Sequence, residues 1–221
     1  MQRRVVSELL DDDLGTPVEV AASLRDLQRI NDWFGGTSTT VSLLRRIASD
    51  QVLRSMSLLE VGAGNGRVPI AARERLAREG IELRVTLVDR LRTHLPQNGT
   101  AVVAADAMYL PFRDASFDVV ACNLMAHHFE PDSLLALAAE QLRVARAAVV
   151  INDVIRSRLL LALTYAGLPL FRSRLTWHDA PASVRRAYTL DEMRSILEQA
   201  GARRVDISTH YLYRMGVVLW K

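Results

Sequence analysis

Three glycines at alternate positions are the first residues in this sequence whose spacing points to chemistry. Gly62, Gly64 and Gly66 follow the apolar stretch 58–61, which contains the acidic Glu60. An apolar run that stops at clustered glycines predicts a buried strand and a tight turn. Glycine tolerates a positive φ and lets a ligand approach the backbone, and a helix starting near Gly66 would offer free N–H groups. Alone, the turn fits either a nucleotide-binding loop or a structural strand-to-helix turn.

Polar residues at the ends of three later apolar stretches extend this pattern: Asp89, Asp106 and Asn123. An acidic residue ending the second strand, roughly 20 residues after the glycine turn, can accept hydrogen bonds from both ribose hydroxyls of a nucleotide. A nicotinamide-dependent oxidoreductase would also have such a carboxylate. The Gly-x-Gly-x-Gly spacing disfavours that alternative, because it lacks the pattern in which a helix N-terminus holds a pyrophosphate.

Stretches with strand and helix patterns alternate through the middle of the chain. Strands are predicted at 58–61, 83–88, 101–105, 117–124 and 147–151, and helices at 68–78 and 131–144, with a short helix or turn near 91–95. Strands that alternate with helices imply right-handed crossovers and a parallel sheet covered on both faces. The sequence therefore predicts a doubly wound, Rossmann-like α/β fold, in which ligands bind at the carboxyl ends of the strands.

The segments on either side of this core follow a different pattern. Two helices are expected before it, the first starting at Thr16 with a capping box, and residues 1–15 are predicted to form a short helix or loose arm. After it come an apolar helix at 158–171, a basic loop at 172–187, a helix from Thr189 to Gly201, and two strands at 205–211 and 215–220.

Composition limits the classes of protein that this chain can belong to. The sequence has 221 residues, 49% of them hydrophobic and 24% charged, a net charge of +3 and one cysteine, Cys122. The arginines are scattered singly or in pairs, which argues against a nucleic-acid surface. No apolar run reaches the roughly 18 residues of a membrane span, and the acidic Asp11–Asp13 is unlike a signal peptide. With a single cysteine, the expected location is cytoplasmic.

Four short segments resemble, in order, the motifs of class I S-adenosylmethionine-dependent methyltransferases. Residues 58–66 (Leu-Leu-Glu-Val-Gly-Ala-Gly-Asn-Gly) resemble motif I, and 85–89 (Val-Thr-Leu-Val-Asp) the acidic motif that follows it. Residues 105–112 are similar to motif II and 116–123 to the motif of the fourth strand. The predicted C-terminal strand pair fits the antiparallel hairpin that ends this family's seven-stranded, mostly parallel sheet. The resemblance is specific for the cofactor and weak for the substrate.

The length of 221 residues predicts a single domain over residues 1–221, or one domain with an added cap, and the resemblance assigns a role to each part of it. Residues 1–50 would form an N-terminal helical cap, 55–153 the cofactor-binding core, 155–188 a lid inserted after the fifth strand, and 189–221 a C-terminal helix and β-hairpin. In this family such a lid commonly forms a wall of the substrate pocket.

The resemblance also implies how S-adenosylmethionine is held, with S-adenosylhomocysteine as the product. Glu60 would lie near the methionine amino group, and the turn residues Gly62, Ala63, Gly64 and Asn65 would contact the amino-acid tail and line the pocket. The remaining contacts would come from Asp89 to the ribose, Arg90 beside the adenine, Asp106 and Ala107 to the adenine edge, Asn123 beneath the sulfonium, and Trp33, in the segment 31–36 that would close over the cofactor.

Three histidines are candidate catalytic residues, because methyl transfer to oxygen often needs a base and histidine titrates near neutral pH. His128 is preferred over His127, and His178 has Asp179 beside it in the predicted lid. Alternatively, the His127-His128 pair only shapes its loop, and His178 belongs to a surface loop. No cysteine–histidine spacing suggests a metal, so no metal ligand is expected.

We expect an enzyme of small-molecule biosynthesis, working as a monomer or homodimer without nucleic acid as a partner. The preferred reaction is O-methylation of an aromatic or polyketide-like hydroxyl. C-methylation of a quinone-type ring is the close alternative. A non-catalytic S-adenosylmethionine-binding protein and a nicotinamide-dependent oxidoreductase remain as alternatives of other classes.

Overall fold

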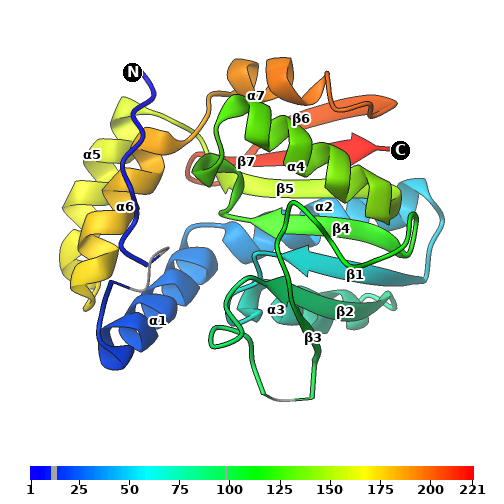
Figure 1. Ribbon diagram of the computed structural model, residues 1–221, viewed down its shortest axis with the longest axis horizontal. Coiled ribbons are helices and arrows are strands. Elements are labelled where there is room, and N and C mark those ends of the chain that lie inside the picture. Colours follow the sequence, from blue (N-terminus) through cyan, green and yellow to red (C-terminus); the bar gives the residue numbers. More distant parts are fainter. Residues whose placement is uncertain (11–13, 98) are drawn as a thin grey trace.

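The predicted alternation of strands and helices is present in the computed structural model of the protein, which describes residues 1–10, 14–97 and 99–221. The acidic stretch Asp11–Asp13 lies outside the described residues. Within them the chain forms one seven-stranded sheet with helices on both faces (Figure 1). This is the expected doubly wound α/β architecture, including its C-terminal antiparallel hairpin.

The strand order across the sheet is β3-β2-β1-β4-β5-β7-β6. The first five strands pair in parallel, whereas β7 runs antiparallel to both β5 and β6. Their bounds are β1 Ser55–Val61, β2 Glu82–Asp89, β3 Ala101–Ala104, β4 Phe117–Asn123, β5 Ala145–Val154, β6 Arg204–His210 and β7 Arg214–Trp220. From β1 the chain adds β2 and β3 on one side of the sheet, and then returns to add β4 on the other side of β1. The order of the strands therefore reverses beside β1, and doubly wound sheets bind ligands at this point.

Two helices cover each face of the sheet with apolar side chains. One face packs against α2 (Gly36–Asp50) and α3 (Arg67–Ala77), and the other against α4 (Pro131–Val144) and α7 (Leu190–Leu197). The contacting side chains follow helical spacing, for example Leu44, Ile47 and Ala48 in α2, all of which are at most 3% exposed. This packing holds the strands in place. The four helices leave the carboxyl ends of the parallel strands uncovered, and the remaining helices lie there.

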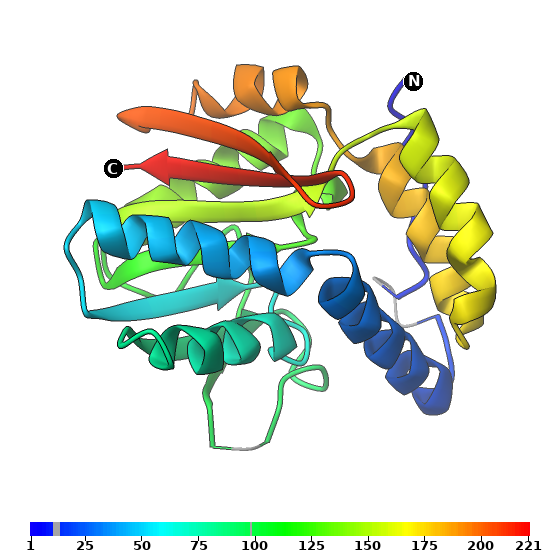
Figure 2. The same ribbon diagram turned by 180° about the vertical axis from the view of Figure 1, so that it is seen from behind.

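Three helices lie beyond the carboxyl ends of the parallel strands (Figures 1 and 2). They are α1 (Pro17–Trp33), α5 (Arg158–Gly167) and α6 (Arg174–Arg186). The α1 helix begins at the predicted capping box, in which the Thr16 side chain accepts from the Glu19 N–H. Buried Asp26 of α1 accepts hydrogen bonds from the backbone N–H groups of Arg172 and Ser173, which joins α1 to the start of α6.

The prediction of a basic loop at 172–187 is wrong, because the structure has the helix α6 there. An internal proline, here Pro181, disfavours a helix because it removes one helical hydrogen bond. The helix forms nonetheless: Ser173 caps its first turn, and Leu175, Ala182 and Val184 are buried. Tertiary packing therefore outweighs the local cost of Pro181. The apolar helix predicted at 158–171 is shorter than expected and ends in the 3₁₀ turn η2 (Leu168–Leu170), which contains a proline.

The N-terminal arm, residues 1–10, contains no helix and crosses α6 (Figure 1). Arg3 donates hydrogen bonds to the carbonyl oxygens of Arg186 and Phe129, at 2.7 and 2.9 Å. The N–H of Leu9 donates to the Asp179 carboxylate at 2.8 Å. These contacts place the arm beside the carboxyl ends of the strands. Among the described residues, no helix is long and apolar enough to cross a membrane.

The glycine turn after β1 generates a prediction about stability. Gly66 has φ +69°, and a Cβ atom there would collide with Leu87 Cδ1, whereas at Gly80, with φ +77°, a Cβ would meet nothing within 4 Å. Gly80→Ala should therefore cost only the left-handed backbone penalty of about 1–2 kcal/mol. Gly66→Ala should cost about 1–3 kcal/mol more, because the core must also be displaced. Urea unfolding of the two variants without ligand measures the difference, and equal losses would contradict the role of packing at Gly66.

Candidate functional site

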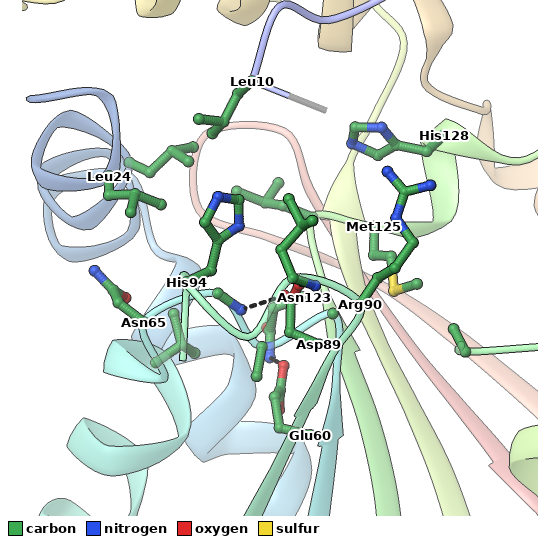
Figure 3. A pocket seen from close by; sticks show the side chains of 18 of the residues that line it. Leu10, Leu24, Glu60, Asn65, Asp89, Arg90, His94, Asn123, Met125 and His128 are labelled. Atoms are coloured by element: carbon green, nitrogen blue, oxygen red, sulfur yellow. Dashed lines mark hydrogen bonds between the residues drawn. The ribbon is translucent and has the colours of Figure 1, made fainter. Parts of the chain in front are cut away.

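A cavity of about 650 Å³ opens at the carboxyl ends of β1, β2 and β4 (Figure 3). Its volume lies within the range of small-molecule and cofactor sites. The walls come from the glycine turn, the strand ends, α1, the N-terminal arm and α6. Residues far apart in sequence, such as Glu8, Asn31, Asp106 and Arg186, therefore share one cavity.

The glycine turn is held to the end of β2 by Asp89. The Asp89 carboxylate accepts hydrogen bonds from the N–H of Gly64 at 2.8 Å and from the N–H of Leu91 at 3.0 Å. Gly64 has φ +51°, and no atom lies within 4 Å of the position that its Cβ would take. Gly62 is crowded instead, since a Cβ there would meet Met125 Sδ at 2.5 Å. The turn thus leaves open space at Gly64, on the side of the cavity.

Glu60 is a buried carboxylate with one oxygen available at the floor of this cavity (Figure 3). Asn123 Nδ2 donates to Glu60 Oε1 at 2.6 Å. Among the described residues, Glu60 Oε2 has no hydrogen-bond partner. Burial raises the pKa of Glu60 to about 7, although the hydrogen bond from Asn123 acts in the opposite direction. A positively charged group in the cavity would satisfy the second oxygen and restore the ionised form.

Asn123 is fixed in place by the polar residues around it. Its Oδ1 accepts from Thr40 Oγ1 at 2.7 Å and from Asn152 Nδ2 at 2.8 Å. Asn152 also donates to the carbonyl oxygen of Gly36, so the network joins β4 and β5 to the first turn of α2. Because these bonds fix the Asn123 amide, its Nδ2 is directed at Glu60.

His127 lies in the 3₁₀ turn η1 (Ala126–His128) and is 2% exposed. Its Nδ1 is 2.7 Å from Asp153 Oδ1, and its Nε2 is 3.3 Å from Glu8 Oε1. Burial disfavours the charged ring, but the Asp153 and Glu8 carboxylates outweigh this effect and raise the pKa of His127 to about 10. His127 is therefore a buried cation at neutral pH, bound between two carboxylates.

His128 is more accessible and lines the cavity (Figure 3). Its ring lies 4.2 Å from the His127 ring, and its Nε2 is 3.8 Å from Glu8 Oε2. Potential metal-ligating atoms of Glu8, His127 and His128 all lie within 4.8 Å of one another. No sequence pattern indicated this group, since Glu8 is far from the histidines along the chain. Arg186 Nη1 lies 4.0 Å from Glu8 Oε1. Its positive charge disfavours the binding of a metal cation by these three residues.

Most of the predicted site residues line this one cavity. They are Glu60, Gly62, Ala63, Gly64, Asn65, Asp89, Arg90, Asp106, Ala107, Asn123, His127 and His128. Two others lie elsewhere. Trp33 is 53% exposed at the end of α1 and does not line the cavity, although Asn31 of the same segment does. His178 is a half-exposed residue of α6, outside the cavity lining, with its Nδ1 2.9 Å from Asp179 Oδ1.

Several cavity residues were not predicted from the sequence as site residues. Glu8, Ser183 and Arg186 reach the cavity only through tertiary packing of the arm and α6. Asp153, which lies behind His127, directly follows the predicted strand 147–151 together with Asn152. The rule that identified Asp89 and Asp106, a polar residue at the end of a strand, could have found this pair. His94 also lines the cavity.

Residues 59–150 match the family model described as a methyltransferase domain. The match covers the glycine turn and the strand ends that form the cavity floor. No curated protein sequence matches the chain.

Solved structures of methyltransferases share the fold. The plantazolicin methyltransferase BpumL, in complex with a triazolic desmethylPZN analog and S-adenosylhomocysteine, is 15% identical, with 97% of this chain and 95% of that chain covered and a TM-score of 0.71. Magnesium protoporphyrin IX methyltransferase from Synechocystis, with bound S-adenosylhomocysteine, is 17% identical over 85% and 83% of the chains, with a TM-score of 0.55. Human N-acetylserotonin methyltransferase with S-adenosylmethionine is 11% identical; the match covers 89% of this chain but 54% of that one, with a TM-score of 0.60.

The buried cation His127 generates a prediction about pH. Its pKa is about 10 in the folded protein against an ordinary value of 6.5 in an unfolded chain, so its contribution to stability is complete below pH 6.5 and is lost as the pH rises toward 10. Between pH 7 and 9 the free energy of unfolding should fall by roughly 2–3 kcal/mol. His127→Gln should remove most of this slope, whereas His178→Gln should keep it. Urea unfolding at several pH values measures both, and a wild-type profile flat over this range would contradict the assignment.

Proposed function

We propose that this chain, a class I S-adenosylmethionine-dependent methyltransferase, methylates a hydroxyl group of a small aromatic or polyketide-like molecule. The observation that carries the proposal is the cavity of about 650 Å³. The segments that resemble the family's cofactor motifs form its floor, and α1, the N-terminal arm and α6 form its other walls. Walls on several sides favour a small molecule over a nucleic acid or a folded protein as the acceptor. Like the family, the chain would work as one domain, with residues 155–188 as its lid, and as a monomer or homodimer.

The residues present fit the cofactor at two independent points. The unpartnered Glu60 Oε2 matches the ammonium group of a bound amino acid, because a buried carboxylate is stabilised by a cation. The open space at Gly64 lets a ligand approach the backbone of the turn. When bound, S-adenosylmethionine supplies an electrophilic methyl group. Glu60, Gly62, Ala63, Gly64 and Asn65 would hold its amino-acid part.

The remaining contacts to the cofactor follow from the strand ends. Asp89 would accept hydrogen bonds from the ribose hydroxyls, and the N–H groups of Gly64 and Leu91 keep its carboxylate oriented. Asp106 and Ala107 would bind the adenine edge, with Arg90 beside the ring, and these residues line the same cavity. Asn123 would lie near the sulfonium, where the Thr40 and Asn152 hydrogen bonds keep its amide fixed.

His128 is the residue that we assign as general base for the acceptor hydroxyl. It lines the cavity, and its ring packs on the His127 ring. His127 cannot take a proton at neutral pH, because it already carries one and is buried between Asp153 and Glu8. We therefore assign His127 a positioning role. Alignment of the hydroxyl with the methyl group would contribute much of the rate even without a base.

The alternative functions differ in the ligand that the cavity should bind and in the reaction that should follow. C-methylation of a quinone-type ring would use the same cofactor site, with His128 removing a ring proton. A nicotinamide-dependent oxidoreductase remains disfavoured by the glycine spacing. A non-catalytic S-adenosylmethionine-binding protein would be favoured by a blocked acceptor pocket, whereas the cavity here continues from the glycine turn to His128.

A labelled-methyl transfer screen tests the proposed reaction. The protein should transfer label from S-adenosylmethionine to at least one phenol or polyketide-like hydroxyl, with product mass analysis locating the methyl group on oxygen. Label found on ring carbon would replace the proposal by C-methylation. Binding of NADH in place of S-adenosylhomocysteine, measured by calorimetry in parallel, would overturn the proposal.

Substitution of His128 tests the proposed base. With an acceptor from the screen, His128→Ala should lower turnover by about 10²-fold or more, because the hydroxyl keeps its proton. Affinity for S-adenosylhomocysteine should stay within twofold of wild type. The matched control is His178→Ala, a histidine outside the cavity, which should leave turnover unchanged. A loss of less than threefold at His128 would reduce its role to shaping the loop.

A further inference from the structure

The outer face of the lid is unusually apolar for an exposed helix. None of the ten residues of α5 is buried, and Arg158 is its one charged residue. Large apolar side chains on this helix, on η2 and on α6 are about half exposed or more: Leu159, Leu163, Tyr165, Leu170 and Trp177. Both ribbon views place α5 as the outermost layer of the molecule, with α6 between it and the rest of the fold (Figures 1 and 2). Large apolar side chains that are exposed together on neighbouring elements indicate an interaction site, whereas single scattered ones do not.

Polar atoms on this face are satisfied within the lid itself. Ser157 caps α5 by accepting from the N–H groups of Leu159 and Leu160, and Thr164 donates to the Leu160 carbonyl oxygen. The indole N–H of Trp177 donates to the Phe171 carbonyl oxygen at 3.0 Å. The Trp177 ring is thereby anchored while half of its surface stays exposed. Such a face can enter an apolar environment without leaving these donors unpaired.

Arginines predominate among the charged residues of the segment that carries this face. From Arg158 to Arg186 the chain has five arginines and a single acidic residue, Asp179, in a protein whose net charge is only +3. Arg186 is buried and lines the cavity, and Arg174 pairs with Glu19, which leaves Arg158, Arg172 and Arg185 for this face. Asp179 is 7% exposed and accepts hydrogen bonds from the N-terminal arm, so its charge is directed away from solvent. Among the described residues, the exposed Arg158 and Arg172 side chains form no ion pair.

We propose that the α5–η2 face of the lid docks on an anionic lipid bilayer. Leucines with tyrosine and tryptophan at their edge, flanked by arginines, have the composition of helices that lie in the membrane interface. Each arginine near an anionic surface adds attraction that decays within a Debye length, so binding depends on salt. The face lies beside α6, whose inner residues Ser183 and Arg186 line the cavity, so docking places the cavity wall near the lipid surface.

Charge favours lipid over a second copy of this chain as the occupant. In a symmetric dimer through this face, Arg158 and Arg172 would meet the same arginines of the partner, with no acidic side chain exposed between Arg158 and Arg186 to compensate them. Like charges brought together in this way oppose association.

Vesicle flotation with the full chain tests the proposal. The protein should float with vesicles of phosphatidylcholine and phosphatidylglycerol at low salt, at least fivefold more than with pure phosphatidylcholine, and about 0.5 M NaCl should reverse this excess. Leu163→Glu should reduce the bound fraction at least fivefold, because it places a charge in the apolar face. The matched control is Val52→Glu, which changes a residue that is 89% exposed and precedes β1, at the opposite ends of the strands.

The different results separate the two occupants. Circular dichroism and S-adenosylhomocysteine binding should show that both variants remain folded. If the wild type fails to float with either vesicle, or if Leu163→Glu floats as well as Val52→Glu, the proposal is wrong. A wild-type dimer in light scattering that Leu163→Glu converts to a monomer, without vesicle binding, would assign the face to self-association instead. None of these readouts depends on which acceptor is methylated.

Discussion

The buried Glu60 carboxylate is the interaction on which the rest of the site depends. It ends up at the floor of the cavity because β1 lies in the middle of the sheet, with one oxygen bonded to Asn123 and the other unpartnered among the described residues. Raising the pKa of this carboxyl group from 4.5 to about 7 makes its ionised form cost about 3 kcal/mol in the free protein. A bound ammonium group would offset that cost, so the buried carboxyl group of the free protein favours the binding of a cation.

The surrounding structure keeps that carboxylate buried and oriented. The parallel strands bring Glu60, Asp89 and Asn123 to one edge of the sheet, and hydrogen bonds from α2 and β5 hold Asn123 against Glu60. On the opposite side of the cavity, the arm and α6 supply Glu8 and Arg186 around the two histidines. One histidine is thereby locked as a cation while its neighbour remains accessible. The same sheet thus carries a site for binding and, next to it, a candidate site for proton transfer.

Local patterns in the sequence were enough to predict most of the fold and the cavity floor. The alternation of apolar stretches, the Thr16 capping box and polar residues at strand ends are all short-range signals, and the structure has each of them. The walls of the cavity depend on long-range packing instead. Helix α6 forms despite Pro181 because its apolar side is buried, and that helix turns His178 outward and Arg186 inward. No local pattern indicates that Glu8 meets His127, since their contact depends on where the arm lies.

Proton release on cofactor binding is the most direct test of the role of Glu60. Calorimetric titration of S-adenosylhomocysteine at pH 6, in two buffers with different ionisation enthalpies, counts the protons released per site. Because Glu60 has a pKa of about 7, it is mostly protonated in the free protein at pH 6 and should ionise when the ammonium group binds. We expect release of close to one proton by the wild type and almost none by Glu60→Gln. Equal release by the two proteins, or none by the wild type, would contradict this role.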